Sequence, residues 1–184
     1  MRLIASASAD ACSIGGNTMR MILLSAPTLA ILTCFTGTAS AQTCRNFEGT
    51  ILLHMTKEGC TSPVGICTLG KVESSDPSIA GANWFFTSLG TAPSAGLPAT
   101  LQPASMLSYA GSVVVTTVQD GTFTTSNAGV YDTTAGAFSQ LDRITSGTGR
   151  FTESKDRLIF ITATGGGDAG FKSYVRGELC LTSQ

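Results

Sequence analysis

Short apolar segments separated by glycine-rich turns follow one another from Asp120 to Cys180, and this alternation constrains the fold more than any other feature of the chain. The turns contain Asp-Gly, Ala-Gly, Ser-Gly-Thr-Gly and Gly-Gly-Gly. The segments between them are rich in β-branched and aromatic residues, which favour extended structure. Strands that recur about every 8–12 residues are typical of antiparallel sandwiches and barrels. We therefore expect a sheet that closes on itself.

The expected strands cover most of the chain after Cys44. Phe47 to Met55 alternates apolar and polar residues, which predicts a strand with one apolar face. The pair Asp120-Gly121 predicts a tight type I′ hairpin, and Ala128-Gly129 predicts a break in the returning strand. Further strands or short extended pieces are expected at 68–74, 81–89, 106–118, 121–127, 130–132, 137–144, 158–164 and 171–181.

This strand pattern predicts the fold class. No segment after residue 41 shows a convincing helical period, and about eight short strands favour a closed barrel. The prediction is all-β: an antiparallel, roughly eight-stranded closed barrel, with a sandwich as the alternative. Segments 113–118 and 158–163 are apolar on both faces. Their outer faces also need cover, which suggests a protomer interface or a covering loop.

The first part of the chain has the features of a secretory signal. Met19-Arg20-Met21 precedes an apolar run from Ile22 to Phe35, and Ala39-Ser40-Ala41 supplies the small residues before a cleavage site. A run of about 14 residues is too short to span a bilayer. We expect residues 1–41 to be a signal peptide with an upstream extension, and residues 42–184 to form a single β-barrel domain that is secreted or periplasmic. Acylation of Cys34 is a disfavoured alternative, since the residues before it are not small.

Cysteines support an oxidising compartment, because an even number remains after cleavage: Cys44, Cys60, Cys67 and Cys180. Three pairings are possible. Cys60 and Cys67 flank a short loop that a local bridge could staple, which would leave Cys44 to pair with Cys180 and tie the first strand to the last. A zinc site is the alternative, but the chain has no Cys-x-x-Cys spacing and a single histidine, so we predict no metal.

Charge narrows the range of partners. The 11 Lys and Arg residues nearly balance the 12 Asp and Glu residues, and they are scattered along the chain. Nucleic-acid binding needs clustered basic residues, so we expect no nucleic-acid partner. We also expect no stable membrane span after cleavage of the signal peptide.

Three motifs and the end of the chain carry a resemblance to known proteins. The segments 60–68, Asp120-Gly121-Thr122-Phe123, Gly147-Thr148-Gly149-Arg150-Phe151 and Gly177-Glu178-Leu179-Cys180 resemble those of small secreted bacterial proteins. Their pattern is similar to that of allene-oxide-cyclase-like and dirigent-like barrels, which are calycin-like. The resemblance implies an eight-stranded antiparallel barrel, a dimer or trimer, with a pocket along its axis. Cyclases of this kind steer a reactive apolar intermediate by confinement and a few polar groups, but their catalytic residues have no one-to-one match here.

Five strand residues are candidates for a site. Glu48 and His54 share one face of the first strand, and could act as acid or base if that face points inward. If the face points outward, Glu48 is a solvated charge. Trp84, Tyr109 and Tyr131 have amphipathic rings that suit a ligand pocket, although aromatic residues in strands often belong to the core.

Two further segments could take part in binding. Arg150 follows Gly147-Thr148-Gly149 and could bind a ligand anion beside the glycine amides. Alternatively it pairs with a carboxylate such as Asp142 or Glu153. The longest stretch without a period, 90–103, is a candidate lid or rim.

These observations predict a barrel that binds a small apolar ligand in its interior, with no cofactor, and that could act as a cyclase or isomerase. The alternative is a structural or protein-interaction barrel. No serine lies in a recognisable triad motif, which disfavours a hydrolase. The interior separates the two predictions: a cavity of about 300 Å³ or more favours ligand binding, and a filled core favours the alternative.

Overall fold

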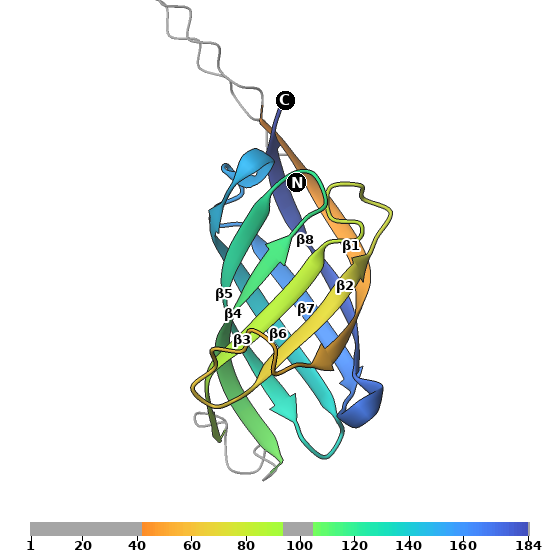
Figure 1. The fold of residues 1–184 in the computed structure, drawn as a ribbon, viewed down its shortest axis with the longest axis vertical. Helices are drawn as coiled ribbons and strands as arrows, with labels where there is room; N and C mark the ends of the chain where they lie inside the picture. Colours follow the sequence, from red (N-terminus) through yellow and green to blue (C-terminus); the bar gives the residue numbers. More distant parts are fainter. Residues whose placement is uncertain (1–41, 94–104, 184) are drawn as a thin grey trace, which may run out of the picture. The chain divides into compact units, whose positions relative to one another are not determined.

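The computed structural model describes residues 42–93 and 105–183, so the predicted signal peptide lies outside the described part. Each strand pairs antiparallel with its neighbours in sequence, and the last strand pairs with the first to close a barrel (Figure 1). The predicted fold class is confirmed. The strands are β1 (Gln42–Met55), β2 (Cys67–Glu73), β3 (Asn83–Pro93), β4 (Met106–Thr116), β5 (Thr122–Asp132), β6 (Ala137–Gly147), β7 (Leu158–Gly165) and β8 (Phe171–Thr182), with short 3₁₀ helices η2 (Gly149–Phe151) and η3 (Gly167–Ala169).

The seam between β1 and β8 is the longest pairing in the barrel. It begins with Gln42 opposite Thr182, and Cys44 lies directly opposite Cys180 with a disulfide between them. The second disulfide joins Cys60 to Cys67, so both predicted pairings are confirmed. The seam bridge connects residues 136 positions apart. In the chain-entropy model, closing so long a loop stabilises the fold by about 4–5 kcal/mol.

The predicted type I′ turn at Asp120-Gly121 is wrong. The loop extends from residue 117 to 121, and Gly121 has a φ of 112° whereas Asp120 does not have a positive φ. The side chain of Thr117 organises this wider turn: its hydroxyl accepts from the Asp120 N–H and donates to the Gly121 carbonyl. A type I′ turn needs positive φ at both central residues, and this longer loop needs it at one.

The predicted break at Ala128-Gly129 is also wrong, because β5 continues through it to Asp132. Gly129 does not break the strand, and it is small for a different reason. A β-carbon there would lie 2.5 Å from the ring of Tyr109, which crosses the strand at this point. At the predicted lid, residues 90–93 belong to β3, and the remainder lies outside the described residues.

We call the end of the barrel at the top of Figure 1 the packed end. Side chains from its loops join the buried core there. Its loops are 74–82, 117–121 and 148–157. Phe151 in η2 is fully buried, and its ring centroid lies 5.2 Å from that of Phe123 in β5. Ile79 from a second loop is 1% exposed. These residues fill the interior at this end.

Candidate functional site

The opposite end of the interior, which we call the mouth, contains a cavity of about 370 Å³. Its volume lies within the range that small-molecule sites occupy. It also exceeds the value that favours ligand binding over a filled core. The cavity is lined by Leu53, Met55, Ile66, Thr68, Trp84, Phe86, Ser88, Thr91, Leu107, Tyr109, Tyr131, Phe138, Gln140, Ile161, Gly167 and Phe171.

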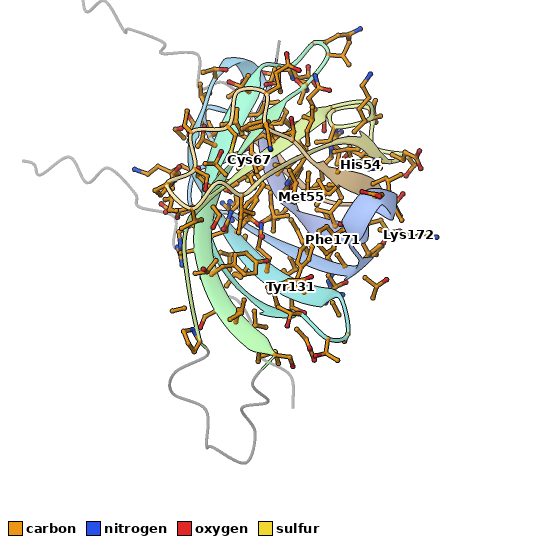
Figure 2. The ribbon with its side chains drawn as sticks, turned by 60° about the horizontal axis from the view of Figure 1, so that its bottom comes forward. His54, Met55, Cys67, Tyr131, Phe171 and Lys172 are labelled. Atoms are coloured by element: carbon orange, nitrogen blue, oxygen red, sulfur yellow. A yellow bond between two sulfur atoms is a disulfide. The ribbon has the colours of Figure 1, made fainter. Side chains whose placement is uncertain are left out.

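Five aromatic rings form a continuous wall around the cavity. Phe86, Tyr109, Phe138, Phe171 and Tyr131 meet in that order, edge to face, with centroids 5.5–6.3 Å apart. Such edge-to-face contacts favour fixed ring positions. Figure 2 shows Tyr131 and Phe171 at this end of the barrel. The wall is therefore apolar and built from rings that brace one another.

The loop between β1 and β2 forms part of the rim. Ile66 lines the cavity, and its carbonyl accepts from the backbone N–H of Ser88 at 3.0 Å. The Ser62 hydroxyl donates to the Ser88 carbonyl at 2.6 Å. The disulfide between Cys60 and Cys67 closes the same loop. The stapled loop thus holds one side of the cavity in place.

Tyr109 brings a hydroxyl group into the cavity wall. It lies opposite Gly129 in the β4–β5 pairing, and Gly129 lies opposite Gln140 in the β5–β6 pairing. Because Gly129 has no side chain, the ring crosses β5 and its hydroxyl reaches Gln140 on the far strand. The Tyr109 hydroxyl donates to Oε1 of Gln140 at 2.9 Å.

Behind Gln140 lies a fully buried carboxyl group, Asp142. Three side chains donate hydrogen bonds to it: Gln140 Nε2 to Oδ2 at 2.7 Å, Thr125 Oγ1 to Oδ1 at 2.5 Å and Asn127 Nδ2 to Oδ1 at 3.2 Å. Among the described residues, no lysine or arginine forms an ion pair with it. The carboxyl is therefore held by neutral donors alone.

Burial determines how this group titrates. It raises the pKa of Asp142 above its ordinary value, because desolvation outweighs the lowering by the hydrogen bonds from Thr125, Gln140 and Asn127. Burial also raises the pKa of Tyr109, and the ionised form of Asp142 raises it further. Tyr109 therefore keeps its proton across the physiological range, and can donate to Gln140.

The structure brings three of the predicted site residues together. Trp84, Tyr109 and Tyr131 all line the cavity, and Trp84 is fully buried from outside solvent, with 1% exposure. Glu48 and His54 lie on the outer face of β1, and both are exposed. Glu48 accepts a hydrogen bond from the Tyr174 hydroxyl at 2.6 Å.

Arg150 lies at the packed end, away from the cavity. It donates to the Asp120 carboxylate at 3.1 Å and to the carbonyl of Thr182 at 3.1 Å. The suggested pairing with Asp142 is wrong, because that carboxyl points into the interior. Arg150 instead ties the loop 117–121 to the last strand.

Sequence reasoning missed the aromatic partners Phe86, Phe138 and Phe171, and it missed Gln140 and Asp142 as interior groups. The sequence did contain a signal for Gln140 and Asp142. Phe138, Gln140, Asp142 and Ile144 alternate along one strand, so an apolar face of β6 carries two polar residues. Polar side chains on a buried face need partners, which marks them for attention.

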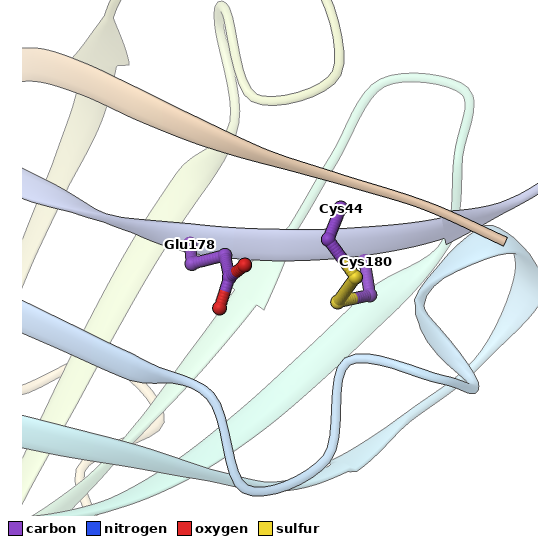
Figure 3. A group of neighbouring side chains, drawn as sticks. All are labelled: Cys44, Glu178 and Cys180. Carbon is purple, nitrogen blue, oxygen red and sulfur yellow. A yellow bond between two sulfur atoms is a disulfide. The ribbon is translucent and has the colours of Figure 1, made fainter. Parts of the chain in front are cut away.

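The part of the chain that the structure describes holds one cluster of potential metal ligands, Cys44, Glu178 and Cys180 (Figure 3). The two sulfur atoms are bonded to each other, so neither is a thiolate. A metal ion would then have a single carboxylate, which is too few ligands for a structural site.

A larger groove, of about 990 Å³, lies on the outer surface and is open to solvent. Four of its charged side chains form two ion pairs. Arg45 donates to Asp76 at 2.6 Å, and Arg157 donates to Glu178 at 3.0 Å. The cavity in the mouth is smaller but enclosed by apolar walls, so it is the better candidate for a small-molecule site.

No protein-family model, curated protein or solved structure matches this chain. Within the described residues, no helix has the length and apolar character that crossing a membrane requires. The resemblance drawn from the sequence is supported as far as the architecture, an antiparallel eight-stranded closed barrel.

Proposed function

We propose that this protein binds a small, largely apolar molecule in the mouth of its barrel. The observation that carries the proposal is the cavity of about 370 Å³ behind a wall of five aromatic rings. Each 100 Å² of apolar surface removed from water contributes about 2.5 kcal/mol. The rings are already braced, so little ordering is required when a ligand enters.

Binding is better supported than turnover. A cyclase or isomerase would need an acid or base in contact with its substrate, or would rely on confinement alone. Asp142 lies behind Gln140, and the raised pKa of Tyr109 makes its phenol a poor acid. Confinement is what this cavity could contribute to a cyclisation. We also propose kinship with allene-oxide-cyclase-like and dirigent-like barrels, on the basis of the shared architecture. A cyclase activity is a proposal on the same basis.

The proposed compartment is extracytoplasmic, secreted or periplasmic. Two disulfides support it, since such bonds persist in oxidising environments. A carrier or sensor of an apolar molecule in that compartment is the role that we propose for the barrel.

The single tryptophan provides a direct test, because Trp84 lines the cavity. Titration of the protein with tetralin, a bicyclic hydrocarbon, should change the Trp84 emission with a dissociation constant on the order of 10 µM. Calorimetry of the same titration gives an independent value. Thr68→Phe, which places a ring in the cavity, should weaken binding at least tenfold. Thr162→Phe on the outer face of β7 is the matched control, and equal binding by both variants would refute the site.

The outer face supports a second candidate function, association with another protein or a second copy. Leu141 lies opposite Phe160 across β6 and β7, and they are 42% and 47% exposed. Val130 and Tyr174 extend this patch onto β5 and β8. Sedimentation of the wild type and of Phe160→Glu tests association with a second copy: an assembly that the charge dissociates supports it, and a monomer in both cases removes self-association.

A further inference from the structure

The hydrogen bonds behind the cavity form a chain with a fixed direction, from Tyr109 through Gln140 to Asp142. Oδ2 of Asp142 accepts from Nε2 of Gln140, so the amide presents Oε1 to Tyr109. An amide oxygen can only accept. Tyr109 must therefore donate its proton to Gln140.

This direction is compatible with both protonation states of Asp142. The ionised carboxylate accepts on both oxygens. In the neutral form, the proton can reside on Oδ1, where Thr125 Oγ1 lies at 2.5 Å and can serve as its acceptor. Oδ2 is then a carbonyl oxygen that still accepts from Gln140. A neutral Asp142 can therefore hold the Gln140 amide in the same orientation as the charged form.

The consequence lies at the cavity wall. The Tyr109 hydroxyl donates its single proton to Gln140. Toward a ligand, its oxygen can therefore only accept a hydrogen bond. We propose that the ligand is an apolar molecule carrying a hydroxyl group, and that this hydroxyl donates to Oη of Tyr109 while the apolar body packs against the aromatic wall. This inference rests on the proposed function, and it specifies the chemical class of the ligand.

Three probes with one carbon skeleton test it: tetralin, 1-tetralone and 1-tetralol. Tetralin reports the apolar binding itself. The ketone can only accept a hydrogen bond, whereas the alcohol can donate one. We expect the wild type to bind 1-tetralol about fivefold to tenfold more tightly than 1-tetralone, the ratio that one net hydrogen bond provides.

Two substitutions change the ratio in different ways. Tyr109→Phe removes the acceptor, so the alcohol should lose its advantage and the two affinities should become equal. Gln140→Met releases the proton of Tyr109, so the ketone should gain affinity and the ratio should fall. Tyr174→Phe, the same change as the first on the outer face, is the matched control and should retain the wild-type ratio.

The outcomes separate the inference from the function. If tetralin binds but the alcohol and ketone bind the wild type equally, the hydroxyl inference is overturned and the binding function remains. If Gln140→Met leaves the ratio unchanged, the fixed direction of the chain is overturned. If none of the three probes binds, the proposed function fails, and the inference fails with it.

Discussion

Two 3₁₀ helices in the described part of the chain, η2 and η3, lie at opposite ends of the barrel (Figure 1). They have opposite effects on its interior. At the packed end, η2 has the sequence Gly-Arg-Phe and buries Phe151 completely. At the mouth, η3 has the sequence Gly-Asp-Ala and buries no residue. The strands supply inward aromatic residues at both ends. Phe151 thus helps to fill the packed end, and the lack of such a side chain in η3 contributes to the open mouth.

Removing a ring should lower the free energy of unfolding by different amounts at the two ends. Phe151→Ala should destabilise the protein by about 3–5 kcal/mol, because it leaves a void in a fully packed region. Phe138→Ala should cost less, about 1–2 kcal/mol, because its ring already borders an open cavity. Urea unfolding with the disulfides intact measures both.

Phe160→Ala on the outer face is the control for these ring deletions, and it should change the free energy of unfolding by less than about 1 kcal/mol. Equal losses for Phe151→Ala and Phe138→Ala would mean that the mouth is as tightly packed as the opposite end, and the cavity would then lose its support.

The two disulfides extend the comparison, since one lies near each end. Replacing Cys44 and Cys180 with serine should cost about 5 kcal/mol in the chain-entropy model, and replacing Cys60 and Cys67 about 2.5 kcal/mol, because the loops differ so much in length. The bridges connect residues 136 and 7 positions apart. Thermal unfolding of both double variants measures the two costs.

Removal of the Cys60–Cys67 bridge should cost less stability but weaken ligand binding more, because Ile66 in the stapled loop lines the cavity. We expect tetralin affinity to fall in the variant without the Cys60–Cys67 bridge and to remain in the variant without the seam bridge. If affinity instead fell only in the variant without the seam bridge, the stapled loop would not be part of the binding site.

Asp142 lies between the packed region and the cavity, and it should make stability depend on pH. Its pKa is raised in the folded state by burial, so folding favours the protonated form. Its contribution to stability is fully present below the unfolded pKa, about 3.9, and is lost as the pH rises through the folded pKa. Each pH unit between the two values is worth about 1.4 kcal/mol.

Asp142→Asn should therefore abolish the fall in stability with rising pH. The variant should gain stability relative to the wild type as the pH rises from 4 to 8. Urea unfolding at several pH values gives the difference. Asp156→Asn is the control, because that carboxylate is 66% exposed. An unchanged pH dependence in Asp142→Asn would show that desolvation does not dominate at this carboxyl.

The barrel could be predicted from the sequence because alternation and turn residues are local signals, and the disulfides followed from the short loop between Cys60 and Cys67. The interior network could not be predicted in the same way. Gly129 resembles a strand breaker in its local context, and its role depends on Tyr109, which faces it from another strand. Similarly, Asp142 gains its properties from Thr125 and Asn127 on β5. Such properties depend on register between strands, which the sequence did not specify.

The smallest expected effect concerns Arg150, the predicted ligand residue that lies at the packed end. Its pair with Asp120 is partly exposed, with side-chain exposures of 32% and 11%, so Arg150→Met should cost no more than about 1 kcal/mol. Because the cavity is at the other end, tetralin affinity should be unchanged within a factor of two. Weaker binding in this variant, with stability retained, would mean that the two ends of the barrel are coupled, and the division between a packed scaffold and a separate binding mouth would have to be abandoned.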